Sequence, residues 1–438
     1  METDLNLPTH DKENSEAAAA GTARWSCHPL NLLLRIRTFE AIRYREFRLI
    51  WLGHLFVASA MWMDQVARGW LIYQLTDSAL QLGLVRGIQA IPFLLLSPVA
   101  GSTADRYSRK AQLVASQVTD GLLYAILALL ILTGRIRPWH VYATAFATAC
   151  LQTFHQPSRV ALIADAVPSS HLTNAMGLNA VIFNVARIIG PSLAGLLIAT
   201  FGIGGSCTFQ ALFYFLATIW TVQLKPVQPS SGGPSVQGTS FARSIIDGWL
   251  FSWRTEAVRA ALLIAMFAAL FVSPMVTLLP VYARDLLGVG ATGQGLLLTS
   301  MGVGALCSAI LLASFGDRMP RGMVMLGGVS LHGLIVMAFS ASLWFQLSLV
   351  LMGFMGLCAV TSHALVQTVI QAHSPSEYRG RTSAIFHMNQ VVLMVGSAFI
   401  GALSSFVGAR WAVASMGAVG TLTMLAILIA LPRVRFIR

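Results

Sequence analysis

The chain is too apolar for an ordinary soluble protein of its length. Hydrophobic residues make up 56% of its 438 residues and charged residues only 11%, whereas a soluble domain has about 25% charged residues. The formal net charge of +12 does not indicate nucleic-acid binding, because the basic residues lie between apolar segments rather than in one patch. The five cysteines have no metal-ligand spacing, so we expect no metal site. The composition therefore favours a protein that crosses a membrane many times.

Twelve apolar segments follow a polar N-terminal tail, residues 1–46, which we expect to be cytoplasmic and partly disordered. Each segment is long enough to span a bilayer as a helix. Six of them form a first half, residues 47–224, and are 48–75, 79–100, 111–133, 139–163, 173–200 and 205–224. The other six form a second half, residues 257–432, and are 257–283, 291–314, 322–341, 344–370, 382–406 and 410–431. Residues 433–438 are expected to form a cytoplasmic C-terminus.

The two halves are connected by residues 225–256, which we expect to be a cytoplasmic linker. Its first part, up to Ser240, is rich in Pro, Ser and Gly, a composition typical of flexible linkers. Its second part, Phe241 to Arg254, has Trp249 and Trp253 among polar residues. This pattern predicts a helix that lies at the membrane interface.

The placement of basic residues predicts the orientation in the membrane. Of the 29 Lys and Arg residues, 21 lie in segments on one side, four in loops on the other side and four inside spans. Because cytoplasmic segments carry the excess of Lys and Arg, both termini are expected to be cytoplasmic, in a cell (inner) membrane.

One short charged motif occurs twice, 212 positions apart. The first copy runs from Gly101 to Lys110 and contains Asp105-Arg106; the second runs from Ala313 to Gly322 and contains Asp317-Arg318. Three glycines, at 190, 195 and 202, also recur at 396, 401 and 408. Repetition at half the chain length predicts two homologous halves.

The first copy, Gly101-x-x-x-Asp105-Arg106-x-x-Arg109-Lys110, resembles the loop signature of the major facilitator superfamily, with Ser108 where the family usually has glycine. The resemblance implies an all-α membrane protein in which 12 transmembrane helices form two pseudo-symmetric six-helix bundles. Three further stretches resemble the enterobactin-exporter and macrolide-efflux branch, which implies export: Phe47–Gly53, Val66–Thr76 and Ala186–Gly195.

In that superfamily the two charged loops latch the halves together at their cytoplasmic ends. The residues that would form such a latch here are Gly101, Asp105, Arg106, Arg109, Asp317, Arg318 and Arg321. The alternative is a pair of loops that only fix the orientation. We favour the latch, because orientation would require the arginines but not the two aspartates.

Two acidic residues inside predicted spans are candidates for proton coupling. Asp64 lies in the first span, and Arg68 follows four residues later on the same helix face. Asp120 lies near the middle of the third span. Ionisable groups within a span are functional candidates by default, because an unpaired buried charge is costly. The alternatives are that Asp64 and Arg68 form a fixed structural pair and that Asp120 makes a polar bond to a neighbouring helix.

Other polar residues within the spans predict a water-filled cavity, since such groups are costly against lipid. The candidates for contacts with a cargo molecule are Gln156, Arg159, Asn184, Arg187, Gln367 and Asn389. Arg159 and Arg187 could contact an acidic cargo, or their charges could be balanced by the two aspartates.

The sequence Gly190-Pro191-x-x-x-Gly195 in the fifth span resembles the antiporter motif of proton-coupled drug exporters. Small residues allow close helix packing, and the proline frees a backbone carbonyl. The alternative is ordinary small-residue packing.

These features predict a secondary active transporter, a monomer that exports a small amphipathic molecule, such as a siderophore or a hydrophobic drug, in exchange for protons. Import of a metabolite on the same fold remains open, as does a membrane receptor that transports nothing. The sequence has no nucleotide-binding loop and no nucleophile–base pair, so we expect neither a cofactor nor enzyme activity.

Overall fold

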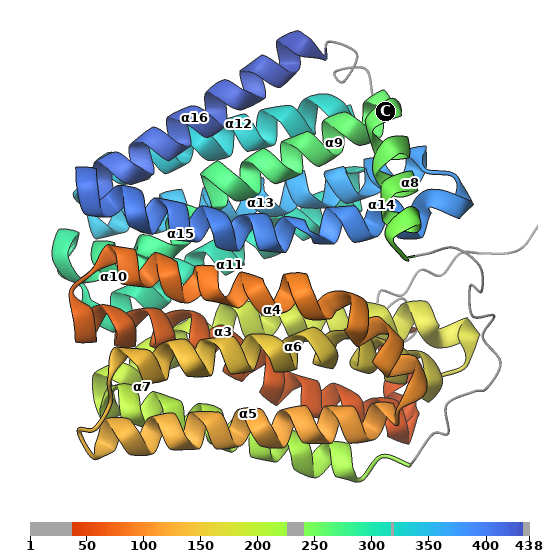
Figure 1. Ribbon diagram of the computed structural model, residues 1–438, viewed down its shortest axis with the longest axis horizontal. Coiled ribbons are helices and arrows are strands. Elements are labelled where there is room, and N and C mark those ends of the chain that lie inside the picture. The colour runs from red at the N-terminus through yellow and green to blue at the C-terminus, as the bar shows by residue number, and fades with distance from the viewer. Residues whose placement is uncertain (1–36, 226–240, 317–318, 432–438) are drawn as a thin grey trace, which may run out of the picture.

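The protein is described by a computed structural model, which covers residues 37–225, 241–316 and 319–431. All regular structure in these ranges is helical. The first half packs in the lower part of Figure 1. Its elements are η1 (Arg37–Arg43), α3 (Arg45–Thr76), α4 (Ala79–Arg106), α5 (Arg109–Leu132), α6 (Pro138–Ala166), η2 (Ser169–His171) and α7 (Leu172–Val222).

The second half packs in the upper part of Figure 1. Its elements are α8 (Phe241–Arg254), α9 (Glu256–Phe267), η3 (Ala268–Val272), η4 (Ser273–Leu278), α10 (Leu279–Val281), η5 (Tyr282–Leu286), α11 (Gly290–Phe315), α12 (Arg321–Ala341), α13 (Phe345–His373), α14 (Ser376–His387), α15 (Asn389–Val407) and α16 (Ala409–Ala430). The short helix α8 lies at one end of the long helices, and α10 lies at the other. We call these the α8 end and the α10 end.

The helices account for the twelve predicted passes through the membrane. Nine helical segments of the described chain are long and apolar enough to span a bilayer. One of them, Ser169–Val222, has 54 residues and makes two passes, because Gly202 inside α7 has φ 70°, a left-handed value that interrupts the helix. The other two passes are α3, with 32 residues, and α6, with 29. Both have the length of a span but carry more polar side chains.

One predicted span, 257–283, is not a continuous α-helix. The α-helix α9 ends at Phe267, and the pass continues to Leu286 through π, 3-10 and short α segments. Pro274 and Pro280 lie in this stretch, and neither can donate the backbone hydrogen bond that a regular helix requires. The predicted span 382–406 is likewise divided, because α14 ends at His387 and α15 begins at Asn389.

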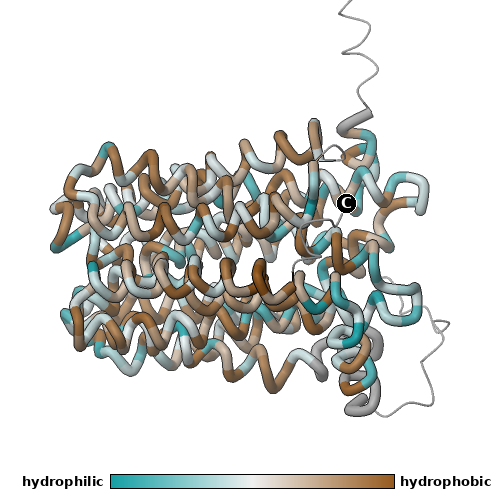
Figure 2. Tube along the Cα trace, turned by 90° about the horizontal axis from the view of Figure 1, so that it is seen from above, coloured by the Kyte–Doolittle hydropathy of each residue, from teal (hydrophilic) through white to brown (hydrophobic). Residues whose placement is uncertain are grey.

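Hydropathy is distributed as in a protein that crosses a membrane. Figure 2 shows hydrophobic positions along the length of the helices and hydrophilic positions gathered toward their two ends. Many large apolar side chains are exposed on the outside of the bundle, among them Leu129, Trp411 and Ile429. An apolar exposed surface of this kind is suited to contact with lipid.

The halves touch at backbone distance through two helix pairs. In the first pair, Gly83 of α4 lies so close to α15 that an added Cβ would be 2.6 Å from the Ser397 carbonyl oxygen. In the second, a Cβ on Gly195 of α7 would be 2.7 Å from the carbonyl oxygen of Ala291 in α11. Such close approach needs glycine. Both contacts lie toward the α10 end.

Candidate functional site

A buried ion pair lies in the first half. The Arg68 guanidinium donates through Nε to both carboxylate oxygens of Asp64, at 3.0 and 2.9 Å. Both residues are on α3, four positions apart, as the sequence predicted for a shared face. Asp64 is 8% exposed and Arg68 only 2%, so Arg68 does not reach solvent. A pair this deep in the bundle carries no net charge, which makes its burial tolerable.

Arg68 also ties α3 to two neighbouring helices. Its Nη2 donates to the Tyr124 hydroxyl of α5 at 3.0 Å, and its Nη1 donates to Thr144 Oγ1 of α6 at 3.1 Å. The Tyr124 ring stacks on Tyr214 of α7, with ring centroids 5.5 Å apart. The orientation of Arg68 therefore affects four passes of the first half at once.

Asp120 lies one turn before Tyr124 on α5 and is 3% exposed. Its Oδ1 atom is buried and has no hydrogen-bond partner in the described part of the chain. Of the two predicted acids, Asp120 is therefore the one with an unused oxygen, whereas Asp64 is held in place by Arg68. A buried carboxylate that lacks partners is stabilised by binding a proton. Together Asp64, Arg68, Asp120 and Tyr124 form what we call the acidic cluster.

A second buried cation, Arg159 of α6, has no carboxylate partner among the described residues. Its Nη1 lies 2.5 Å from Nδ1 of His54 on α3, and its Nη2 donates to Gln156 Oε1. Its Nε and the Nε2 of the neighbouring His155 have no partner among these residues. Gln156 is exposed, which connects this buried group to a solvent-accessible surface.

The remaining cavity candidates are distributed over three helices. Arg187 Nη2 donates to Asn184 Oδ1 at 2.9 Å within α7, and the Arg187 Nε atom has no partner within the described ranges. Gln367 of α13 is exposed, and Asn389 at the start of α15 is half-buried with an unpartnered Oδ1. The structure does not join these residues into one hydrogen-bonded cluster with Arg159, so their common role stays a prediction.

Most of the residues predicted for the latch lie outside the described ranges or in a segment where only the backbone is described. Asp317 and Arg318 lie outside the described residues, and only the backbone of α4 is described at Gly101, Asp105 and Arg106. Arg109 begins α5 and pairs with Asp165 at the end of α6, with Nη1 2.5 Å from Oδ2. Arg321 begins α12. Asp165 was not among the residues predicted for a latch, and the structure shows its pairing with Arg109.

Ser108 occupies the N-cap position of α5. Its hydroxyl oxygen accepts a hydrogen bond from the Ala111 backbone N–H at 3.3 Å. This bond satisfies one of the free amides at a helix start. The departure from the family glycine therefore has a local structural reason.

The antiporter-like motif packs against both halves. A Cβ on Gly190 would be 2.7 Å from the Trp62 Cβ of α3, whereas Gly195 meets α11 of the other half. The Pro191 carbonyl lies against Gly295, also on α11. The motif thus allows α7 to approach its neighbours on two sides.

Polar contacts between the halves occur at the α10 end. The Arg284 guanidinium of η5 lies 2.6 Å from the carboxylate of Asp77, which follows α3. The Tyr73 hydroxyl donates to Asp285. A cavity of about 440 Å³ adjoins these contacts and is lined by Trp70, Tyr73, Gln74, Arg284, Gly288 and Gly290. The sequence did not indicate this arrangement, because its members are more than 200 residues apart.

Two apolar side chains of α4 are exposed beyond its contact with α15. Gly83 and Gly87 of α4 contact α15, and Ile91 and Leu95 lie one and two turns farther along, rotated about 40° and 80° from Gly87 at about 100° per residue. Ile91 is 47% exposed and Leu95 is 64% exposed.

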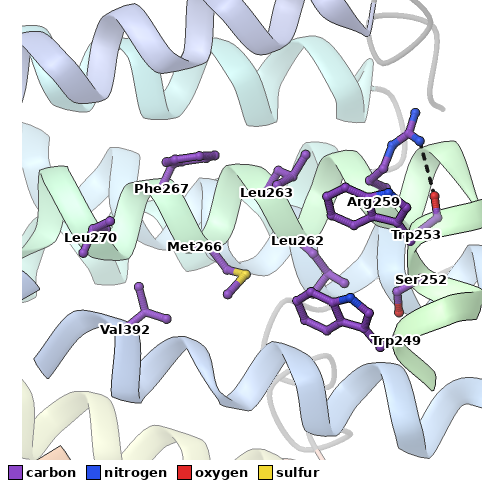
Figure 3. A pocket seen from close by; sticks show the side chains of 10 residues that line it. All are labelled: Trp249, Ser252, Trp253, Arg259, Leu262, Leu263, Met266, Phe267, Leu270 and Val392. Atoms are coloured by element: carbon purple, nitrogen blue, oxygen red, sulfur yellow. Dashed lines mark hydrogen bonds between the residues drawn. The ribbon is translucent and has the colours of Figure 1, made fainter. Parts of the chain in front are cut away.

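A second cavity, of about 390 Å³, lies at the α8 end of the second half. Figure 3 shows its wall, which is formed by Trp249 and Trp253 of α8, by one face of α9 and by Val392 of α15. Its lining is apolar except for Arg259 and Ser252, and the Ser252 hydroxyl donates to the Gly248 carbonyl. The sequence predicted the helix but not the cavity beneath it. We call this cavity the α8 crevice.

Several named relatives are transporters. An MFS-type transporter of Bacillus subtilis (strain 168), YfiS, is 25% identical over 354 residues, which cover 77% of this chain and 81% of that protein. The multidrug efflux pump Tap of Mycolicibacterium fortuitum is 27% identical over 73% of this chain and 79% of its own. The staphyloferrin A transporter of Staphylococcus aureus (strain NCTC 8325 / PS 47) is 30% identical, but over only 37% of this chain and 41% of its own.

Solved structures share the fold at low sequence identity. A bacterial homologue of the human lysosomal transporter Spinster, in an inward-facing and unoccupied conformation, matches with a TM-score of 0.68 and 14% identity over 90% of this chain and 96% of that one. A POT family transporter matches with a TM-score of 0.71 and 12% identity over 89% of this chain and 96% of its own. The profile of the transmembrane secretion effector family, MFS_3, matches residues 36–436. The protein therefore belongs to this family, and it is a multi-pass membrane transporter with the major facilitator fold, two pseudo-symmetric bundles of six helices.

Proposed function

We propose that the protein exports a small amphipathic molecule in exchange for protons. The observation that carries this proposal is the acidic cluster, which places a paired acid and an acid with an unused oxygen inside a transporter. Efflux also fits the relatives named as multidrug and macrolide efflux proteins, and another relative is named as a staphyloferrin A transporter. The cargo would be a siderophore or a hydrophobic drug. The protein would need no cofactor, catalyse no reaction and act as a monomer.

The excess of basic residues supports an orientation in a cell membrane with the α8 end and both termini in the cytoplasm. In this orientation the contacts at the α10 end close the protein toward the outside, and the exposed side chains of α4 would line an opening toward the cytoplasm. Residues 47–224 and 257–432 would rock as two bundles, joined by residues 225–256.

The acidic cluster provides a route from proton binding to helix movement. A proton on Asp64 would remove the charge that holds Arg68, and Arg68 bonds to Tyr124 of α5 and Thr144 of α6. Asp120, one turn from Tyr124, would offer its unpartnered Oδ1 to a proton. Proton binding would thus loosen the bonds that fix α3 against α5 and α6.

The cargo would bind between the halves on the polar groups of α6, α7, α13 and α15, which are Gln156, Arg159, Asn184, Arg187, Gln367 and Asn389. Arg159 fits this role because it is buried with a free Nε and joins exposed Gln156. When the α10 end opens, a latch would close the α8 end. Its residues would be Gly101, Asp105, Arg106, Arg109, Asp317, Arg318 and Arg321.

The proposal is tested in cells that differ only in this protein. We would measure the intracellular amounts of erythromycin and of a catecholate siderophore, with and without a protonophore. The expected result is a lower amount of one of these compounds in cells that have the protein, and loss of the difference when the protonophore is added. A difference that persists without a proton gradient would contradict proton coupling, and a higher intracellular amount would indicate import.

A further inference from the structure

The α8 crevice has the dimensions of one lipid chain in one leaflet. Its wall on the second half runs along α9 from Arg259 to Leu270 of η3. At about 1.5 Å per residue this stretch is roughly 16 Å long, which is about half of the 30 Å hydrocarbon thickness of a bilayer. Figure 3 shows Leu270 and Val392 at the inner end and the tryptophans at the other. The crevice lies between α9 and α15, and an apolar opening of this kind is suited to contact with lipid.

The mouth of the crevice has the features of a membrane interface. Trp249 is 45% exposed and Trp253 is 51% exposed, and their rings stack with centroids 6.3 Å apart. Both lie on α8, whose apolar and polar residues fall on opposite faces. Tryptophans on such a helix are typical of the boundary between lipid chains and headgroups. The end at the tryptophans is therefore at the level of the headgroups, and the end at Leu270 and Val392 is at the level of the chains.

A cation is positioned where a lipid phosphate would lie. The Arg259 guanidinium donates to the Trp253 carbonyl oxygen at 3.3 Å and lies 6.0 Å from the Trp253 ring centroid. These contacts hold Arg259 at the mouth without neutralising its charge. Two basic residues, Arg254 and Arg259, flank a single acidic residue, Glu256. The other acid of this region, Asp247, lies 3.7 Å from Arg381, which balances its charge. The mouth is therefore complementary to an anionic group.

We propose that the α8 crevice binds an anionic phospholipid of the cytoplasmic leaflet, with one acyl chain along α9 and the phosphate at Arg259. The apolar wall recognises the chain, and the guanidinium recognises the headgroup charge. The site is separate from the polar residues assigned to the cargo, and the proposal does not depend on the direction of transport. It requires that the chain spans a membrane with α8 at the interface, and the assignment to the cytoplasmic leaflet rests on the orientation given in the proposed function.

The test is native mass spectrometry of the purified full chain with added phosphatidylglycerol or phosphatidylcholine of identical acyl chains. Wild type should bind phosphatidylglycerol about fivefold more tightly than phosphatidylcholine. This is the factor expected for one basic residue beside an anionic lipid. Arg259→Gln should remove this preference, and Arg259→Lys should restore most of it. Met266→Trp, which fills the middle of the crevice, should weaken the binding of both lipids.

The matched control is Arg135→Gln, since Arg135 is exposed in a loop at the α10 end. It should bind both lipids as wild type does. Thermal unfolding and gel filtration establish that each variant is folded before its binding is compared. Equal binding of the two lipids to wild type would overturn the proposal, and so would wild-type binding by both Arg259→Gln and Met266→Trp. Loss of bound phosphatidylglycerol on addition of erythromycin would show that the crevice takes a hydrophobic cargo instead, and would overturn the lipid as its occupant.

Discussion

The Asp77 carboxylate lies 2.6 Å from the Arg284 guanidinium, and this ion pair joins the end of α3 in one half to η5 in the other. Arg284 also lies over the Tyr73 ring, 5.3 Å from its centroid, and Tyr73 donates to Asp285. Four side chains therefore join the halves at the α10 end, and the proposed alternating access would require them to separate.

Removing the ion pair should favour the open α10 end. Arg284 and Asp77 are 40% and 69% exposed at their side chains, so the pair contributes less than about 1 kcal/mol, or about fivefold in population. In Arg284→Gln, a cysteine introduced at Gln74 should react up to about fivefold faster with a membrane-impermeant thiol reagent. Arg135→Gln is the control with unchanged reactivity. Slower labelling in Arg284→Gln would contradict a closing role for the pair.

A methyl group added at a glycine contact between the halves should also favour the open α10 end, and more strongly than loss of the ion pair. Gly195→Ala would place a Cβ 2.7 Å from the Ala291 carbonyl oxygen, and overpacking of this kind costs about 1–3 kcal/mol. We expect a lower transport rate and faster labelling at Gln74. Gly177→Ala, on the same helix but with nothing within 4 Å, should leave both unchanged. Equal effects of the two alanines would mean that the change acts on α7 itself rather than on the contact with α11.

Arg68 should matter for stability as well as for transport. Arg68→Gln leaves Asp64 buried without its partner, and breaking a buried pair in this way costs about 3–5 kcal/mol. We expect a lower unfolding temperature and less folded protein. The double variant Asp64→Asn with Arg68→Gln should recover much of the stability, because no unpaired charge remains. A double variant as unstable as Arg68→Gln would show that the bonds to Tyr124 and Thr144 matter more than the ion pair.

The cap of α5 can be tested with two substitutions at one position. Ser108→Ala removes the oxygen that accepts from the Ala111 amide and should cost about 1 kcal/mol of stability. Ser108→Gly, which introduces the residue usual in the superfamily, should cost only a few tenths of a kcal/mol. Thermal unfolding of the two variants distinguishes these values. If glycine is as destabilising as alanine, the hydroxyl is not the reason for serine at this position.

The passes through the membrane could be predicted because hydropathy over about 20 residues is a strong signal. The Asp64–Arg68 pair could be anticipated because both residues lie on one helix at four-residue spacing. The division of the seventh pass into α, π and 3-10 segments was missed, although Pro274 and Pro280 were visible in the sequence. A proline in a span does not by itself specify which hydrogen-bond pattern replaces the regular one.

Contacts between distant segments could not be predicted. His54 and Arg159 are 105 residues apart, and Asp77 and Arg284 more than 200, so no local spacing connects them. Asp120 was placed near mid-membrane from its position in the span, but its unpartnered oxygen depends on the packing of α5 against α7. The N-cap role of Ser108, in contrast, could have been predicted, because a serine directly before a helix is a recognisable N-cap signal.

Proton release from inverted vesicles tests the central claim most directly. Vesicles are made acidic inside, a pH-sensitive dye reports their internal pH, and siderophores, macrolides and lipophilic cations are added to wild type and to Asp64→Asn. The account predicts that one class of compound dequenches the dye in wild type and that the response is lost in Asp64→Asn, compared in vesicles that contain equal amounts of inserted, folded protein. Full activity of Asp64→Asn would remove this acid from the mechanism, and the absence of dequenching by any compound would contradict proton-driven export of these classes.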